Sequence, residues 1–161
     1  MADVLDASQL ALLERRIDEW LAELRAEHDH LVAVDRDESD ARRGLVRWYV
    51  RMRGEDKEFT TVWLTLGQRT LRYETYVMPA PEENAAELAD QLLRRNDTLV
   101  GAHFSIGAED AVYLRGETDS VHVTKHTVDD LLGLLYAQVE QCFLALLRIG
   151  YPRFFAGDSP A

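Results

Sequence analysis

The sequence predicts an α+β domain, in which a mainly antiparallel sheet carries helices packed on one face. Apolar residues recur at helical spacing near both ends of the chain, over residues 8–27 and 125–148. Between these two segments apolar and polar residues alternate, which is typical of strands that bury one face. Short turns join the alternating segments, so consecutive strands are expected to pair antiparallel as hairpins.

The first predicted element is a helix over residues 8–27, with Ser8 as its N-cap. Five residues at helical spacing form its buried stripe: Leu10, Leu13, Ile17, Leu21 and Leu24. A short strand at 31–34 and a charged loop at 35–43 follow. The next strand, 45–53, alternates between two faces, with Val46, Trp48, Val50 and Met52 on the inner face and Arg47, Tyr49, Arg51 and Arg53 on the outer face.

Residues 54–58 form the predicted turn into the next strand, 59–66. If all five are loop residues, Val50 lies opposite Val62 and the apolar faces of the two strands coincide. A loop of four residues would place Tyr49 opposite Val62 and would mix apolar with polar positions. We therefore predict the five-residue loop.

Gly67 and Gln68 read as a two-residue hairpin turn of type II′, which favours glycine at its first position. The strand that follows, 69–78, then pairs with 59–66. This turn predicts Leu64–Leu71 and Val62–Tyr73 as inner pairs, and Trp63–Arg72 and Thr61–Glu74 as outer pairs.

Pro79 and Pro81 end that strand, because neither has a backbone N–H to donate to a ladder. A helix is expected to begin at residues 82–84 and to end at Asn96 or Asp97. Three leucines form its predicted buried side: Leu88, Leu92 and Leu93.

A strand at 99–106, a turn at 107–110 and a strand at 111–117 complete the predicted sheet. The first of these strands places four residues on one side: Val100, Ala102, Phe104 and Ile106. The long apolar helix at 125–148 is capped by Thr124 or Thr127 and is expected to be buried on more than one side. We expect one domain over 1–161, with an ordered core of about 8–150 and a C-terminal tail at 151–161.

Composition limits the class of function. The chain has 161 residues, 18 basic and 29 acidic, for a net charge of −11, which disfavours binding to a phosphate backbone. The N-terminus lacks the features of a signal peptide, and no uncharged apolar stretch approaches the roughly 18 residues that span a bilayer. We therefore expect a cytoplasmic protein without a membrane or nucleic-acid partner.

The sequence contains no phosphate-binding motif of the G-x-x-x-x-G-K-[ST] or G-x-G-x-x-G type. His103 and Ser105 lie in a stretch that resembles a nucleophile elbow, but its first glycine is missing and no acidic residue is in line behind the histidine. Cys142 lies among leucines and reads as a packed, inert thiol. No catalytic residue is predicted.

Metal and carboxylate patterns are equally incomplete. Asp35, Asp37 and Asp40 lack the glycine and the glutamate of a calcium loop. The remaining histidines, His28, His30, His122 and His126, form two pairs without a third ligand. The acidic pairs Glu82-Glu83 and Asp129-Asp130 fall in predicted first helical turns, where acids stabilise the positive end of the helix. We predict no metal and no cofactor.

One surface stands out. The outer face of the predicted sheet gathers arginines and large aromatic residues, a composition enriched at binding hot spots. The candidate partner-binding residues are Arg47, Tyr49, Arg51, Trp63, Arg72 and Tyr76, with Glu74 among them. An arginine over Trp63 would make a cation–π pair. Two interpretations remain open: a surface that binds a partner, and a solvated surface of mutually stacked arginine and tryptophan.

Several stretches, within a match that runs from about Trp48 to Ile149, resemble the YbjN family of bacteria, especially its actinobacterial branch. They are Trp63-Leu64-Thr65-Leu66, Glu74 to Asn84, Leu92-Leu93-Arg94-Arg95-Asn96, Gly101 with Phe104-Ser105-Ile106, and Val112-Tyr113-Leu114-Arg115-Gly116. The resemblance implies a type III secretion chaperone-like fold, whose members commonly dimerise and bind protein segments. It also implies a regulatory role, and it carries over no catalytic residue.

These observations predict a non-enzymatic interaction, chaperone-like or regulatory module that binds a protein or peptide, a second copy of the chain being one candidate. The partner would dock on the outer face or add an extended segment to a sheet edge. The alternative is a small-ligand sensor domain or an undetected hydrolase, with a pocket between sheet and helices near His103 or Tyr113.

Overall fold

Six strands pair antiparallel in the order β1-β2-β3-β4-β6-β5 in the computed structural model, which describes residues 3–157. The elements are α1 (Ala7–Glu27), β1 (Leu31–Asp37), β2 (Val46–Arg53), β3 (Phe59–Leu66), β4 (Thr70–Met78), α2 (Ala85–Thr98), β5 (His103–Ile106), β6 (Val112–Asp119) and α3 (Lys125–Gly150). Short 3₁₀ turns lie at Ala41–Arg43, Ala108–Asp110, Ser120–His122 and Pro152–Phe155. The predicted α+β class is confirmed.

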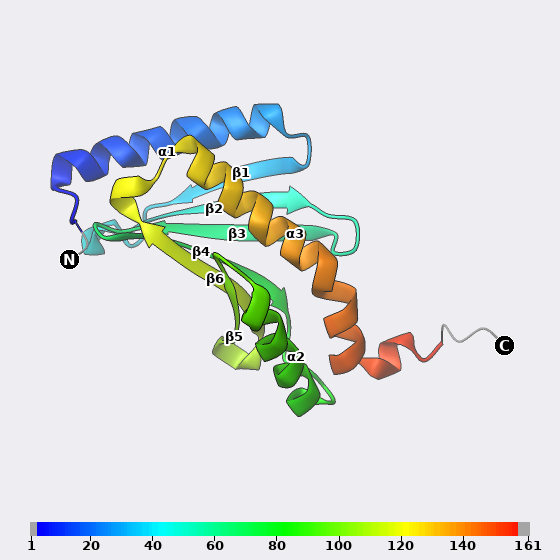
Figure 1. Cartoon of the computed structure of the whole chain (residues 1–161). Coiled ribbons are helices and arrows are strands. Elements are labelled where there is room, and N and C mark those ends of the chain that lie inside the picture. The colour runs from blue at the N-terminus through cyan, green and yellow to red at the C-terminus, as the bar shows by residue number, and fades with distance from the viewer. Residues whose placement is uncertain (1–2, 158–161) are drawn as a thin grey trace.

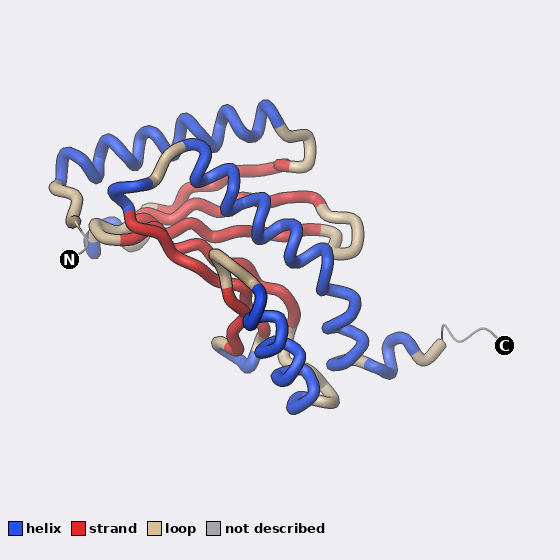
Figure 2. Tube along the Cα trace, in the orientation of Figure 1, coloured by secondary structure: helices blue, strands red, loops and turns tan. Residues whose placement is uncertain are grey.

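All three helices lie on one side of the twisted sheet (Figures 1 and 2). α1 packs over β1, α3 crosses β3 and β4, and α2 packs against β5 and beside α3. α3 is long and apolar enough to cross a membrane by length and composition alone, a test that core helices also pass. Here it is a core helix, whose inward side chains from Val128 to Leu146 pack against the sheet.

Strict alternation in the central strands builds the core. Apart from the half-buried Val46, the inward residues of β2, β3 and β4 are fully or almost fully buried, among them Trp48, Val50, Val62, Leu64, Leu71 and Val77. Burying a side chain of this size stabilises the fold by roughly 1.5–3 kcal/mol. The residues between them necessarily point to the opposite face, which no helix covers (Figure 1).

The predicted register between β2 and β3 is confirmed, with Val50 opposite Val62 across the loop 54–58. The register predicted between β3 and β4 is wrong by two residues, because in the structure Leu66 pairs with Leu71 and Leu64 pairs with Tyr73. The turn is centred on Gln68 and Arg69. Gly67 belongs to the ladder, where its N–H donates to the carbonyl of Thr70 at 2.9 Å.

Tertiary contacts place this turn at Gln68 and Arg69, one residue later than the turn at Gly67 and Gln68 that local sequence preference predicts. Ser120 donates its side chain to the carbonyl of Gly67 and its backbone N–H to the carbonyl of Arg69, both at 2.8 Å. A two-residue shift retains the strand period, so Leu64, Leu71 and Tyr73 remain on the predicted inner face.

α1 begins one residue earlier than predicted, and Asp6 caps it in place of Ser8. The Asp6 carboxylate accepts from the Gln9 N–H at 2.8 Å, while the Gln9 side chain accepts from the Asp6 N–H. A second polar contact joins α1 to the sheet: the buried indole of Trp48 donates to Asp18 at 2.7 Å. β1 also extends to Asp37, beyond its predicted end.

α2 begins at Ala85, after Asn84, whose backbone is left-handed at φ 59°. Glu82 and Glu83 therefore precede the helix, and their N–H groups donate to the carbonyl of Gly150. Leu93 was predicted to be buried but is 70% exposed, because only Leu88 and Leu92 of α2 face the core.

The strand predicted at 99–106 is regular only over β5. Val100 lies outside the strand and is 84% exposed, and Ile106 ends the edge strand at 53% exposed. Phe104 is buried as predicted. α3 has the predicted cap, with Thr124 and Thr127 in a reciprocal capping box. Of the predicted tail at 151–161, residues 158–161 lie outside the described residues.

Gly116 is required by close packing. The ring of Tyr73, whose hydroxyl donates to the Gly101 carbonyl, lies directly over it, and a Cβ at residue 116 would collide with that ring. By contrast, a Cβ added at Gly133 on α3 would enter open space.

We expect Gly116→Ala to lower the free energy of unfolding by about 1–3 kcal/mol, because the added methyl overpacks the site. Gly133→Ala is the matched control and should raise it by up to about 1 kcal/mol, because alanine favours the helix. Urea unfolding followed by tryptophan fluorescence measures both. Equal effects of the two substitutions would contradict the packing assigned to Gly116.

Candidate functional site

The candidate site is the uncovered outer face of the sheet. Alternation places all six predicted residues there, on three neighbouring strands: Arg47, Tyr49 and Arg51 on β2, Trp63 on β3, and Arg72 and Tyr76 on β4. Cross-strand pairing sets two rows. Tyr49, Trp63, Glu74 and Arg115 form one, and Arg47, Thr65 and Arg72 form the row beside it.

A chain of aromatic rings crosses this face. The ring centroids of Tyr49 and Trp63 lie 6.4 Å apart, those of Trp63 and Tyr113 6.3 Å, and those of Tyr113 and Tyr76 5.7 Å. Two of the three contacts are edge-to-face, a favourable geometry for aromatic pairs. The four rings stabilise one another, and Tyr113 is only 9% exposed at the centre of the cluster.

Tyr113 and Arg115 belong to this face but were not among the predicted residues. The Arg115 guanidinium lies 4.3 Å from the centre of the Tyr113 ring and contacts Glu74 at 3.1 Å. It also donates to the hydroxyl of Ser105 at 3.2 Å. The alternation of Val112 and Leu114 indicates that Tyr113 points outward, but only the β4–β6 pairing shows that it lies beside Trp63 and Tyr76.

The predicted arginines are arranged differently from the expected arginine–tryptophan stack. Arg51 lies over the ring of Phe59 at 3.8 Å, and Arg47 donates to the hydroxyl of Thr65 at 3.2 Å. Within residues 3–157, neither these two nor Arg53 and Arg72 form an ion pair with a carboxylate. Arg47 nevertheless lies opposite Asp37, where it is one of the groups that lower the pKa of that carboxyl, after hydrogen bonds from Ser39 and Tyr49.

Both edges of the sheet carry side chains that occupy backbone groups. At β5, the side-chain amide of Asn96 from α2 accepts a hydrogen bond from the Phe104 N–H at 2.7 Å and donates one to the Phe104 carbonyl at 3.0 Å, as the backbone of a neighbouring strand would. On β1 the Arg25 side chain donates to the carbonyl of Val32 at 3.1 Å. These contacts would interfere with addition of a strand at Phe104 on β5 and at Val32 on β1.

The loop 54–58 closes one end of the face and is held by α3. The Glu140 carboxylate accepts from the N–H groups of Glu55 and Asp56 at 2.9 and 3.0 Å. The amine of Lys57 donates to the carbonyl of Tyr76 and lies 5.5 Å from the Tyr76 ring centre. Burial lowers the pKa of Lys57 to about 8, although the nearby Cys142 and Glu140 act in the opposite direction.

This lowered pKa predicts a pH-dependent stability. Between pH 8 and 10.5 the unfolded chain retains a proton on Lys57 that the folded chain has lost, so the contribution of Lys57 to stability increases with pH. We expect the free energy of unfolding of the wild type, relative to Lys57→Met, to increase by about 1–3 kcal/mol across this window. Cys142, whose pKa burial raises to about 11, acts oppositely but is common to both proteins.

Urea unfolding at a series of pH values measures that difference. Lys125→Met is the control, because Glu23 and Glu27 raise the pKa of Lys125 and its contribution should not increase between pH 8 and 10. A wild-type minus Lys57→Met difference that is flat over this range would show that Lys57 is not desolvated.

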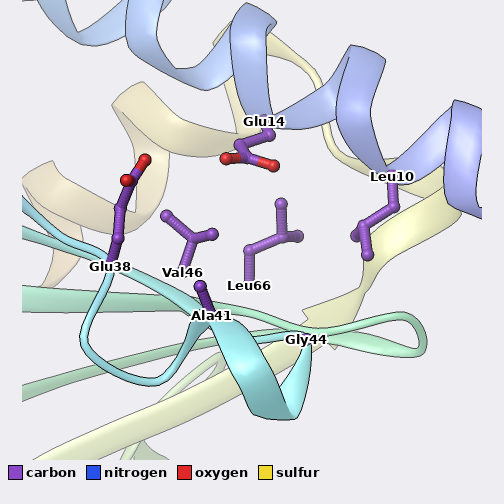
Figure 3. Close-up of a pocket in the computed structure, with 7 residues that line it drawn as sticks. All are labelled: Leu10, Glu14, Glu38, Ala41, Gly44, Val46 and Leu66. Atoms are coloured by element: carbon purple, nitrogen blue, oxygen red, sulfur yellow. The ribbon is translucent and has the colours of Figure 1, made fainter.

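A pocket of about 220 Å³ lies between α1 and the loop after β1 (Figure 3). Glu14 and Glu38 face it above an apolar floor that includes Val46 and Leu66. Both carboxylates, and Asp18 beside them, contact the single guanidinium of Arg36. This network joins α1 to β1, and its acids already have a cationic partner.

The other sequence candidates do not come together into a site. Among residues 3–157, no three His, Cys, Asp or Glu side chains are placed to hold a metal ion. His28 and His126 contact Asp129 and Asp130 separately, at 3.3 and 3.0 Å. These two aspartates lie in the second turn of α3, after the first turn in which they were predicted.

A pocket of about 260 Å³ lies between α2 and the strands β5 and β6, as expected, and Leu88, Ile106 and Val112 are among the residues that line it, but His103 and Tyr113 do not line it. The buried residues Phe104, Val112 and Leu114 are the ones that face the helices, so both candidates point to the outer face. His103 is exposed on the edge strand, and Tyr113 is packed among the aromatic rings.

The sequence profile of the YbjN family, described as "Putative bacterial sensory transduction regulator", matches residues 15–148. The uncharacterized protein Rv0487 of Mycobacterium tuberculosis is 32% identical over 102 residues, which cover 63% of this chain and 56% of the relative. The uncharacterized protein ML2442 of Mycobacterium leprae is 30% identical over 108 residues, covering 67% of this chain and 59% of the relative. The match therefore spans less than three fifths of each relative.

Two of the three solved structures with the same fold given below are described as type III secretion proteins. A chain of the ExoU–SpcU complex of Pseudomonas aeruginosa gives a TM-score of 0.53 at 13% identity, covering 84% of this chain and 98% of that one. A chain of the ExsC–ExsE complex gives 0.56 at 18%, with coverage of 82% and 94%. The structure of the Yersinia pestis chaperone SycH with a fragment of YscM2 gives 0.51 at 16%, with coverage of 80% and 98%. The predicted chaperone-like fold is confirmed.

Proposed function

This chain belongs to the YbjN family, and we propose that it is a regulatory interaction module that binds a protein or peptide without catalysing a reaction. The binding surface in this proposal is the outer face of the sheet. The observation that carries it is the chain of rings from Tyr49 through Trp63 and Tyr113 to Tyr76, flanked by arginines without carboxylate partners and covered by no helix. A cytoplasmic location, independent of membranes, nucleic acids and cofactors, is part of the proposal.

Aromatic rings and arginines are the side chains that contribute most to protein–protein recognition. Rings that already pack against one another lose little conformational freedom on binding, so less of the binding energy is spent on ordering them. The fold offers a parallel, since the three structures of similar fold are all complexes between two proteins, and one of them contains a type III secretion chaperone. The face, rather than an edge, is favoured because Asn96 and Arg25 occupy backbone groups on the two edge strands.

The ligand-sensor and hydrolase alternatives have less support. The acids at the pocket beside α1 are held by Arg36, and Ser105 contacts Arg115 rather than a histidine. A dimer that uses the same face remains within the proposal, with a second copy as the partner.

The proposal predicts that Arg47→Glu combined with Arg72→Glu abolishes capture of a partner. The tagged protein is crosslinked in its native cell and the captured proteins are compared with those of the wild type. Arg72 is exposed and Arg47 is half-buried on the uncovered face, outside the core, so the fold should persist, which circular dichroism checks.

Arg42→Glu combined with Arg43→Glu is the matched control. It makes the same change in net charge on the exposed 3₁₀ turn Ala41–Arg43. We expect the control to capture the same proteins as the wild type. If the Arg47/Arg72 variant captures them equally well, the outer face is not the binding surface.

A further inference from the structure

We infer that the segment recognised by the outer face is an acidic polypeptide, with carboxylates that contact Arg47 and Arg72 on either side of Thr65. This inference rests on the proposed function and specifies the chemistry of its partner. The site consists of two neighbouring rows on one surface, one of which carries Arg47 and Arg72 and the other Tyr49 and Trp63.

The distribution of charge carries the first step. The chain has a net charge of −11, and several of its basic side chains form ion pairs within the chain: Arg36 contacts three carboxylates, and Lys125 contacts two. On the outer face the opposite holds, because Arg47, Arg51, Arg53 and Arg72 have no carboxylate within ion-pair distance among the described residues. Arginines without an ion pair also occur elsewhere in the described chain, Arg42 and Arg43 among them, but four of them share the outer face of β2 and β4.

The carboxylates nearest to them in the sheet are otherwise engaged or lie at the ends of the row. Asp37, opposite Arg47, accepts from the Ser39 N–H at 2.8 Å and from the Tyr49 hydroxyl at 3.4 Å. Glu117, opposite Arg72, forms no ion pair in the described part of the chain. Glu74, the central acid, is neutralised by Arg115.

The spacing of Arg47 and Arg72 suits a segment that carries two carboxylates. Arg47 and Arg72 both pair with Thr65, one from each neighbouring strand, so their backbones are about 10 Å apart at two strand spacings. Their guanidinium groups can bind two carboxylates of one segment, and arginine is suited to bidentate contacts of this kind. The next row supplies Tyr49 and Trp63, against which apolar or aromatic parts of the same segment can pack.

Nucleic acid and a face-to-face dimer fit these observations less well. The rings of Trp63, Tyr113 and Tyr76 pack against one another instead of offering open faces for base stacking, which disfavours nucleic acid. Two copies joined through this face would bring their arginines together.

A random dodecapeptide library displayed on phage tests the inference with the intact protein immobilised. We expect the wild type to enrich peptides rich in Asp and Glu, and the Arg42/Arg43 control to enrich the same pool. The Arg47/Arg72 variant, now carrying two glutamates, should enrich Lys and Arg instead. Arg51→Glu combined with Arg53→Glu provides a second variant should the first fail to fold.

One enriched acidic peptide is then labelled and measured by fluorescence polarisation. We expect at least tenfold weaker binding by the Arg47/Arg72 variant, and a similar loss when the acids of the peptide are changed to amides. A single-stranded oligo-dT of 20 nucleotides should not compete.

The outcomes separate the inference from the function on which it rests. Enrichment of neutral or basic peptides that is lost in Trp63→Ala would overturn the acidic partner while leaving a peptide-binding face. Competition by oligo-dT, or dimers that dissociate in the Arg47/Arg72 variant without acidic enrichment, would also overturn it. No enrichment on the wild type would count against both.

Discussion

Burial of a single face of the sheet is the constraint from which the rest of this structure follows. α1 and α3 cover the inner face, so Trp48, Val62 and Leu64 are removed from water together, and each strand of the sheet has one correct phase. The same phase sends Tyr49, Trp63 and Arg72 to the other side. The outer face is therefore fixed by the core, and its residues are held in register by side chains that no partner touches.

That constraint explains how much of the structure the sequence could predict. Alternation in 45–53, 59–66 and 69–78 determines which face each residue takes, and all six predicted surface residues lie on the face that it assigns. Alternation does not determine which residues pair across two strands, since a shift of two residues between β3 and β4 leaves every side chain on the same face. That choice depends on Ser120, which reaches the turn from a segment about fifty residues away in the sequence.

Other parts of the site depend on contacts that have no local signal. Tyr113 joins the ring cluster because β6 lies between β4 and β5 in the sheet and pairs with β4. The periodicity of a sequence does not determine the order of its strands in the sheet. Asn96 reads as the end of a helix, yet its amide closes the edge of β5. Leu93 follows the leucine pattern of α2 but lies beyond the width of the core that this short helix covers.

An acidic partner on an acidic protein has a consequence for selectivity. At long range the net charge of −11 repels such a segment, and at physiological salt this repulsion is screened over about 8 Å. Within about 10 Å of the outer face, which is also the separation of the Arg47 and Arg72 backbones, the arginines attract the acidic segment. A segment whose carboxylates do not match that spacing meets the repulsion without the compensating contacts. The overall charge therefore acts against wrong partners, while the arginines and rings of the outer face select the right one, and both are needed for specificity.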